Sequence, residues 1–485
     1  KKNLDIEIPI KKPSIISKKL IVEKKKGLVE KDKKKQEVAI EKDKLVTKKI
    51  IVKNTDSFLY PIKKPVTFKI HSSKRVVKSS ILNAPDYINA KEVFNLIKKS
   101  KWDSALLITK KIKDKEFNNL VTWLYLKETG NRASFNDYSN FISKNPNYPR
   151  INRLRYLAEQ KIILKNTTPK EIVNWFDVQE PLSGIGKIKL GEALLQLGEN
   201  ARGVGLIKSG WTTAKLSSND LKFYRKKFKN FIKTNDHLKR ADYMAWNNKY
   251  WDLKRMLRYL PKDERLLYNA RFVLMTHSYG VDKAISEVPG NLQNDIGLKY
   301  DRLKWRNRRN RLESSIEILE NSPTNEAELI RADLWWLERK DITRDLIYKK
   351  DYSLAYKVAS NNFLSEGPEF AEAEWLSGWL ALRFLDNPDT AIEHFENFYK
   401  NVGYPISLAR GAFWLGLAYE KNNNMEKAKK YFKEGSKFTN TYYGQLAFNK
   451  IKLGQDFKLS PGHKVKEGYE KEFNKNKLIR HIKLL

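Results

Sequence analysis

Apolar residues recur at three- and four-residue spacing from about residue 84 onward, the spacing that places them on one face of a helix. Polar or glycine-containing turns such as Gly130-Asn131 separate these segments. No run of alternating polar and apolar residues is long enough for a buried strand, so the pattern predicts an all-α protein. The first helices are expected at Asn89–Lys99, Asp103–Ile112, Lys115–Lys127, Ile151–Leu164 and, after Thr168-Pro169, at Lys170–Phe176.

A second period runs over longer distances in the C-terminal part. Ala355, Ala391 and Ala428 are spaced by 36 and 37 residues, each in a helix that follows a short polar turn. The last unit also has Leu415-Gly416, Tyr419 and Phe432, which fits the tetratricopeptide pattern. Small residues let paired helices approach, and the aromatic ring fills the gap, so each hairpin needs a neighbour. We therefore expect a superhelical solenoid of tetratricopeptide-like hairpins.

Residues 1–83 have a different composition. They are dense in lysine and poor in aromatics, and all 12 Trp of the chain lie at or after Trp102. Such a segment cannot bury enough apolar surface to offset the entropy of ordering. We expect it to be a largely disordered arm that precedes a helical domain over residues 84–455.

Net charge suggests an acidic partner. The chain has 95 Lys plus Arg against 57 Asp plus Glu, a net charge of +38, which points first to a polyanion. Nucleic-acid binders usually interleave basic residues with aromatics, and the densest lysine segment lacks them, so this class ranks last. The chain has no Cys, which rules out disulfides and thiolate metal sites. No apolar stretch reaches the roughly 18 residues that a spanning helix needs, so we expect a soluble or peripheral protein.

Catalytic and metal-binding patterns are weak. None of the six His residues has another at the three- or four-residue spacing of paired ligands, so no metal or cofactor is predicted. Glu372 and Glu374 are two apart, which points them in different directions on a helix and favours a solvated face over an acid and base pair. The glycines at 184, 186 and 191 do not form a phosphate loop and are interpreted as helix punctuation.

Several blocks of the sequence resemble one family in order. They look like the helical ring domain of the soluble lytic murein transglycosylases, including the Trp-Leu-Ser-Gly-Trp helix and the Pro-Leu-x-Gly-x-Gly turn of that family. The blocks are Glu180–Gly186 with Leu190–Gly198, Trp335–Arg339, Ala371–Leu385, Pro405–Gly416 and Thr441–Leu446. The resemblance implies that the helices close into a ring.

The same resemblance implies a function. The family cleaves peptidoglycan between N-acetylmuramic acid and N-acetylglucosamine to 1,6-anhydro ends, with one glutamate in a C-terminal lysozyme-like domain. The only Glu-Ser dipeptide, Glu313-Ser314, lies inside the expected helix Leu312–Leu319 and is interpreted as solvated, so no catalytic residue is expected in this chain. Residues 456–485 resemble the start of the linker towards that domain. The chain begins with Lys1, which is compatible with a removed signal peptide and a periplasmic protein.

Candidate contact residues follow from these blocks. Trp375, Trp379 and Leu382 share a helix face and are interpreted as a core stripe. We expect contacts with substrate or with the catalytic domain at Arg383, Arg410, Tyr442, Tyr443 and Gln445, although structural ion pairs are the commoner role of such arginines.

Three functions stay open at this stage. The first is the ring portion of an exported lytic transglycosylase, with peptidoglycan glycan strands and its own lysozyme-like domain as partners. In this case the N-terminal arm could contact an anionic membrane. The second is a non-catalytic tetratricopeptide-like scaffold for protein assembly. The third is a basic nucleic-acid-binding protein.

Overall fold

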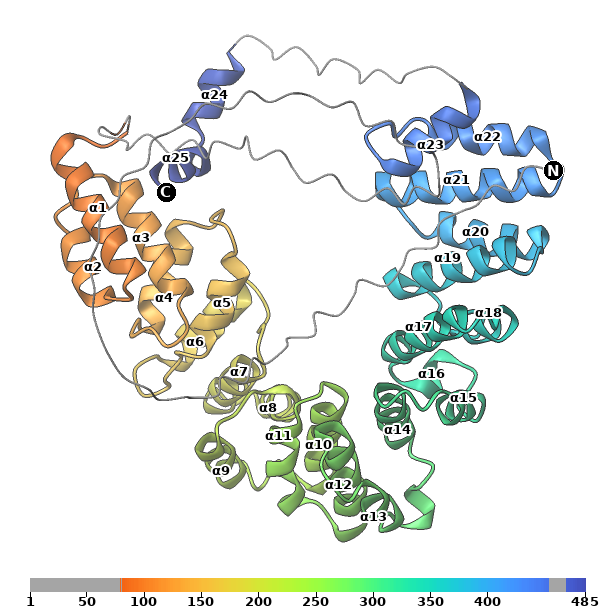
Figure 1. The fold of residues 1–485 in the computed structure, drawn as a ribbon. Coiled ribbons are helices and arrows are strands. Elements are labelled where there is room, and N and C mark those ends of the chain that lie inside the picture. The colour runs from red at the N-terminus through yellow and green to blue at the C-terminus, as the bar shows by residue number, and fades with distance from the viewer. Residues whose placement is uncertain (1–78, 80, 453–467) are drawn as a thin grey trace, which may run out of the picture. The chain divides into compact units, whose positions relative to one another are not determined.

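Every regular element that the structure describes is a helix. The computed structural model describes residues 79, 81–452 and 468–485. The all-α prediction is confirmed for this part of the chain (Figure 1). The predicted disordered arm, 1–83, lies almost entirely outside the described residues, and so does much of the predicted linker at 456–485. None of the described helices is both long and apolar enough to cross a bilayer.

The first half of the helical domain has thirteen α-helices in the described residues. They are α1 (Ala84–Lys98), α2 (Trp102–Thr109), α3 (Lys115–Lys127), α4 (Phe135–Lys144), α5 (Ile151–Glu159), α6 (Pro169–Asp177), α7 (Gly184–Gln196), α8 (Asn200–Thr213), α9 (Ser218–Lys227), α10 (Thr234–Trp246), α11 (Tyr250–Met256), α12 (Lys262–Thr276) and α13 (Val281–Ser286). Two 3-10 turns, Leu257–Tyr259 and Gly290–Leu292, follow α11 and α13.

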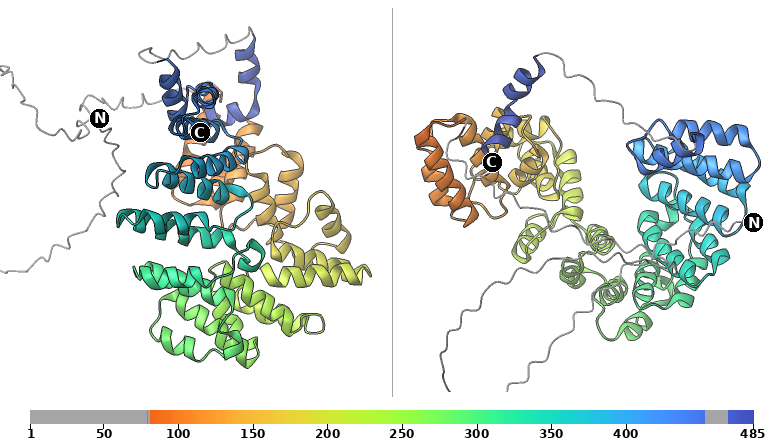
Figure 2. Two further views of the ribbon diagram at one scale, coloured as in Figure 1. Left: turned by 90° about the vertical axis from the view of Figure 1, so that its right-hand side faces the viewer. Right: turned by 45° about the horizontal axis from the view of Figure 1, so that its top comes forward.

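The second half continues the same arrangement. Its helices are α14 (Ile296–Arg308), α15 (Leu312–Glu320), α16 (Glu326–Leu329), α17 (Ala332–Tyr348), α18 (Tyr352–Ser360), α19 (Gly367–Arg383), α20 (Pro388–Lys400), α21 (Pro405–Lys421), α22 (Met425–Gly435), α23 (Tyr442–Ile451), α24 (Tyr469–Lys475) and α25 (Lys477–Leu484). From α17 to α22 each helix packs against the next one along the chain (Figure 2). This is the solenoid of helical hairpins that the repeat spacing predicts.

The sequence placed most of the early helices correctly, but not their ends. Helix α3 has the predicted bounds, and Thr168 caps α6 by accepting a hydrogen bond from the Glu171 amide. Helix α5 is shorter than predicted and ends at Glu159. Ile162 and Leu164 still pack into the same core as α5, although their backbone has left the helix. Apolar spacing therefore persists beyond the helix end.

Glycines bring α7 and α8 into backbone contact. A Cβ added at Gly191 would lie 2.6 Å from the Gly203 carbonyl oxygen, and one at Gly203 would lie 2.8 Å from the Gly191 oxygen. Both glycines lie inside their helices. The interpretation of Gly191 as punctuation is wrong, because its lack of a side chain permits a close helix crossing.

Glycine and phenylalanine interlock in the C-terminal hairpins. The Phe395 ring of α20 packs on Gly378 of α19, where an added Cβ would lie 2.8 Å from the ring. The Phe432 ring of α22 packs on Gly416 of α21 in the same way, at 2.5 Å. Ala355, Ala391 and Ala428, the residues that define the predicted repeat, are all fully buried. The packing reason given for the repeat is therefore confirmed.

The helix α25 packs on α3, far from it in sequence. His481 Nε2 lies 2.7 Å from the Tyr148 hydroxyl and 3.1 Å from Glu116 Oε2. Arg480 forms an ion pair with Asp114 at the N-terminus of α3. Leu484 packs against the hydrophobic core of α1 to α3.

The closure of the helices into a ring, which the family resemblance implies, stays a prediction.

Candidate functional site

An arginine stacked on a tryptophan lies where α19 and α21 meet. The guanidinium carbon of Arg410 is 3.4 Å from the centre of the Trp375 ring, a cation–π contact. Trp375 lies on α19 and Arg410 on α21, and both helices begin with a proline in their first turn. The half-buried Arg410 side chain is thus held against the aromatic surface of the preceding hairpin.

More aromatic rings extend this surface. The rings of Trp375 and Trp379, one turn apart on α19, are nearly parallel at 6.1 Å between centroids. Trp414 of α21 meets Trp375 edge-on at 5.9 Å, and the exposed Arg383 lies 5.8 Å from the Trp414 ring. The core-stripe interpretation is confirmed for Leu382, which is buried, and Trp375 and Trp379 pack against the same core while staying only half-buried.

Helix α23 adds one tyrosine of the predicted pair. Tyr443 packs on Phe413 at 5.7 Å and lies 6.0 Å from the Arg410 guanidinium, while Tyr442 points to solvent and is 70% exposed. Of these two adjacent tyrosines, only Tyr443 therefore lies at the Arg410 site. Gln445 Nε2 donates to the Thr439 carbonyl at 3.0 Å, so this side chain is engaged in the turn before α23.

Arg410 and Arg383 do not form the ion pairs that the sequence favoured. No carboxylate of a described residue forms a salt bridge with either guanidinium, and Arg410 Nε makes no hydrogen bond within that part of the chain. Burial lowers the pKa of Arg410, and Tyr443 and Glu372 partly oppose the shift. Arginine keeps its proton despite such shifts. The site therefore presents a fixed positive charge on an aromatic surface.

The two nearby carboxylates have separate neighbours. Glu372 accepts from Lys340 Nζ at 2.8 Å and from Trp336 Nε1 at 3.1 Å. Burial acts to raise the pKa of Glu372, but these two hydrogen bonds leave it below the ordinary value. Glu374 faces another direction, as predicted, yet it is 5% exposed, so its interpretation as solvated is wrong. Glu372 is thus an ionised carboxylate that accepts two hydrogen bonds, and it does not suit the role of a proton donor.

A buried polar network that the sequence did not reveal surrounds Glu374. Its Oε2 lies 3.0 Å from His394 Nδ1 and 3.0 Å from Asn397 Nδ2, and His394 Nε2 lies 3.0 Å from the Tyr356 hydroxyl. The three polar side chains around Glu374 come from α18 and α20, and so the network links two hairpins through α19. No spacing rule pairs residues 20 apart across a helical hairpin, which is why this network was missed.

A basic segment with a tryptophan was also missed. A cavity of about 290 Å³ is lined by Arg302, Trp305, Arg306 and Arg311 of α14 and the turn after it. Arg309 and Arg311 lie 4.5 and 5.0 Å from the Trp305 ring. Residues 302–311 thus combine cations with an aromatic ring, the pattern that the lysine-rich arm lacks, and this pattern is visible in the sequence.

No catalytic or metal-binding constellation was predicted. Glu313 is a 90% exposed helix residue, 3.9 Å from Lys349 Nζ, in agreement with its interpretation as solvated. Across residues 81–452 and 468–485, no cluster of three or more His, Asp or Glu side chains has metal-ligand geometry.

Comparison with known proteins gives fold-level likeness only. No family model matches this chain, and no curated protein matches it in sequence. Among solved structures, the TPR domain of P58(IPK) is 11% identical and covers 76% of this chain and 98% of that chain, with a TM-score of 0.22. The Cut9–Hcn1 hetero-tetramer of APC/C is 14% identical, and the match covers 74% of this chain and 88% of that chain with a TM-score of 0.19. The human IFIT1 dimer with PPP-AAAA is 13% identical, and the match covers 75% of this chain and 96% of that chain with a TM-score of 0.22.

These TM-scores are low, so the neighbours carry no argument about function, and the fold rests on the helix pairing described above. The family of lytic transglycosylases stays a prediction from sequence motifs. What the helices themselves establish is an all-α solenoid of tetratricopeptide-like hairpins.

Proposed function

We propose that residues 84–455 are a repeat scaffold that holds an acidic macromolecule against cationic and aromatic side chains. The observation that carries this proposal is the Arg410 guanidinium, which lies on the Trp375 ring without an ion-pair partner among the described residues. An arginine fixed in this way keeps its charge and its fork of donors for a carboxylate or a phosphate. Because Glu372 and Glu374 are engaged by other groups, the site suits binding and positioning rather than proton transfer.

A finer candidate is the ring portion of a periplasmic lytic transglycosylase. It would position glycan strands of peptidoglycan for a C-terminal lysozyme-like domain, and the N-terminal arm would contact an anionic membrane. The observation that favours it is that three of the resembling blocks, 371–385, 405–416 and 441–446, meet around Arg410. The acidic stem peptides of peptidoglycan would supply the carboxylates that Arg410 and Arg383 lack.

Co-sedimentation with purified sacculi tests both the scaffold proposal and the transglycosylase candidate. We expect the protein to pellet with sacculi, and Arg410→Met to raise the apparent Kd about five- to tenfold, which corresponds to about 1 to 1.4 kcal/mol of binding free energy. The affinity of Arg410→Lys for sacculi should lie between those of the unaltered protein and Arg410→Met, because lysine keeps the charge but loses the planar stack. Arg202→Met is a matched control, since Arg202 is an exposed arginine on α8 that forms an ion pair with Glu199 of the same helix end.

A parallel titration with single-stranded and double-stranded nucleic acid distinguishes the alternatives. Binding that falls steeply with salt, together with no retention on sacculi, would contradict the peptidoglycan candidate and favour the basic segment on α14 as the functional site. Retention on sacculi that Arg410→Met and Arg202→Met reduce equally would contradict the role given to Arg410.

A further inference from the structure

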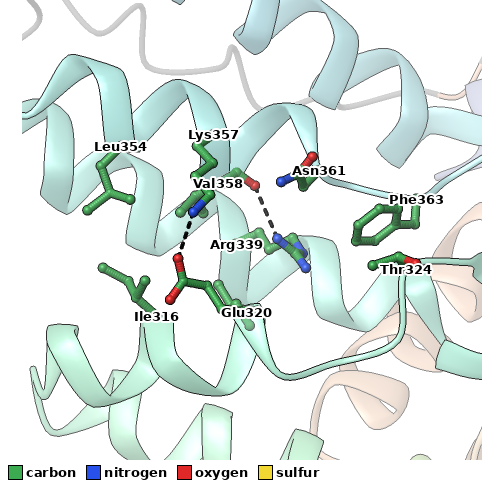
Figure 3. Close-up of a pocket in the computed structure, with 10 residues that line it drawn as sticks. Ile316, Glu320, Thr324, Arg339, Leu354, Lys357, Val358, Asn361 and Phe363 are labelled. Atoms are coloured by element: carbon green, nitrogen blue, oxygen red, sulfur yellow. Dashed lines mark hydrogen bonds and ion pairs between the residues drawn. The ribbon is translucent and has the colours of Figure 1, made fainter.

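A cavity between α15, α17 and α18 has an unusual composition. Its volume is about 200 Å³, and Figure 3 shows ten side chains around it. Most of its wall is aliphatic or aromatic, as with Ile316, Leu354 and Phe363. The volume lies below the roughly 300–1,000 Å³ of sites for drug-sized ligands, so it fits a small molecule or one residue of a peptide.

The cation in this wall is Arg339. The residue is 2% exposed, and Figure 3 shows its guanidinium directed from α17 towards Val358 of α18, near Thr324 and Phe363. Nη1 donates to the Val358 carbonyl over a long 3.4 Å, and the guanidinium carbon is 5.3 Å from the Phe363 ring. Its Nε makes no hydrogen bond, and no carboxylate within the described ranges forms an ion pair with it. Burial lowers the pKa of Arg339 to about 10, so it stays charged at neutral pH.

Other buried arginines of the chain are better satisfied. Arg271 forms ion pairs with Asp301 and Asp242. Arg240 donates to two carbonyls at the C-terminal end of α8, those of Trp211 and Ala214. Arg155 donates to the Trp175 carbonyl at 3.1 Å and stacks on that ring at 4.3 Å. Arg339 has only one long bond to the last turn of α18, and it alone of these four lines one of the two cavities described.

A buried charge without a counter-ion is costly, and the usual remedy is a paired anion. The other charges at the cavity already balance, because Lys357 Nζ and Glu320 Oε1 form an ion pair at 2.8 Å (Figure 3). The net charge of the wall is therefore the single positive charge of Arg339. A ligand that complements it carries one negative charge and an apolar body.

We propose that this cavity binds a carboxylate with a short branched or linear alkyl chain, held by Arg339. Its planar donors match a carboxylate in geometry. Ile316, Leu319 and Leu354 would take up the alkyl part. Two sources share this chemistry: a free aliphatic acid, and the carboxyl-terminal residue of a peptide. The inference is independent of the scaffold proposal, which rests on Arg410.

Calorimetric titration of the full chain tests it with four probes. They are 3-methylbutanoate, its amide 3-methylbutanamide, N-acetyl-glycyl-leucine with a free carboxylate, and the amide of the same dipeptide. We expect at least one acid to bind with a Kd below about 1 mM and its amide at least tenfold more weakly. Preference for the dipeptide acid identifies a chain terminus as the source, and preference for the free acid identifies a metabolite. No binding of either acid at about 20 mM, or equal binding of acid and amide, overturns the proposal.

Variants assign the binding to Arg339. Arg339→Met should raise the Kd for the acid at least tenfold. Arg344→Met, which changes an exposed arginine on the same helix, should leave that Kd unchanged. Thr324→Trp fills the cavity from its exposed rim and should abolish binding without touching the core, with Thr324→Ser as its control. This second pair of variants tests the cavity even where Arg339→Met does not fold. Unchanged affinity in Thr324→Trp shows that the acid binds elsewhere and overturns the assignment.

Discussion

Two regions of the solenoid differ in how fully the hydrogen-bond donors of their arginines are satisfied. In the region of α10 to α14, Arg271 is fully buried and its Nε lies 2.7 Å from Asp301 Oδ2, with Asp242 Oδ1 3.2 Å from Nη1. In the region of α17 to α23, Arg339 and Arg410 are packed among apolar and aromatic groups without an acid from the described residues. Arg240 of the first region also has no ion pair, but two carbonyls accept its hydrogen bonds, so the buried guanidinium groups of the first region are more fully satisfied. In the second region, glycine and phenylalanine interlock between paired helices.

The difference indicates where function is to be sought. A neutralised guanidinium such as that of Arg271 has its donors occupied and serves the fold. A guanidinium that is held by ring stacking or by one carbonyl keeps donors for a partner. The comparison therefore assigns stability to the first region and binding to the second, and each assignment has a measurable consequence.

The largest effect is expected at Arg271. Arg271→Met would leave Asp301 buried without a counter-charge, which destabilises a protein by about 3–5 kcal/mol. Chemical denaturation followed by circular dichroism measures the loss. The control is Arg132→Met, which removes a pair that is 85% and 75% exposed and should change stability by less than about 1 kcal/mol. Similar losses in both variants would refute the structural role given to the buried pair.

A smaller effect is expected at the glycine contacts of the second region. Gly416→Ala places a methyl group 2.5 Å from the Phe432 ring and should cost about 1–3 kcal/mol through overpacking. Gly205→Ala offers the opposite case, because Gly205 is a helical glycine on α8 with open space around it. That change should stabilise the protein by about 0.5–1 kcal/mol through helix propensity. Thermal unfolding of both variants should move in opposite directions; movement in the same direction would contradict the interlocking role of Gly416.

The smallest effect concerns pH and the first region. Burial, together with Arg225 and Arg240, lowers the pKa of His237 below its ordinary 6.5. The folded protein therefore resists a proton that the unfolded chain takes up, so the contribution of His237 to stability should be constant above pH 6.5 and fall as the pH drops below it. Melting temperatures between about pH 5 and 8 should show a gentler acid slope for His237→Gln than for the unaltered chain. Equal slopes would exclude His237 as the responsible group.

The fold could be predicted from the sequence where the packing of the helices repeats at a regular residue spacing. Ala355, Ala391 and Ala428 predicted the stacked hairpins because a small residue is required wherever two helices cross closely. The end of α5 was misplaced because Ile162 and Leu164 reach the core from a non-helical backbone. Gly191 was misread for a related reason: its contact partner, Gly203, lies on the following helix, and spacing within one helix does not reveal it.

The candidate site was readable only in part. Arg410 and Tyr443 were named from sequence and lie near each other, but the ring on which Arg410 stacks, Trp375, was assigned to the core. Arg339 lies at the end of the block Trp335–Arg339, but the sequence predicts no role for it, because burial without a counter-ion is a three-dimensional property. Charge counts along a sequence do not reveal which cations are paired.

The contact between α25 and α3 has a consequence for biosynthesis. Arg480 is 366 positions after Asp114, its ion-pair partner, and Leu484 contributes to the core of the first helices. A ribosome therefore completes α1 to α3 long before it makes α25, which packs on α3. Until α25 is made, the part of α3 that it contacts stays uncovered, and transiently exposed apolar surface of this kind favours aggregation and chaperone binding.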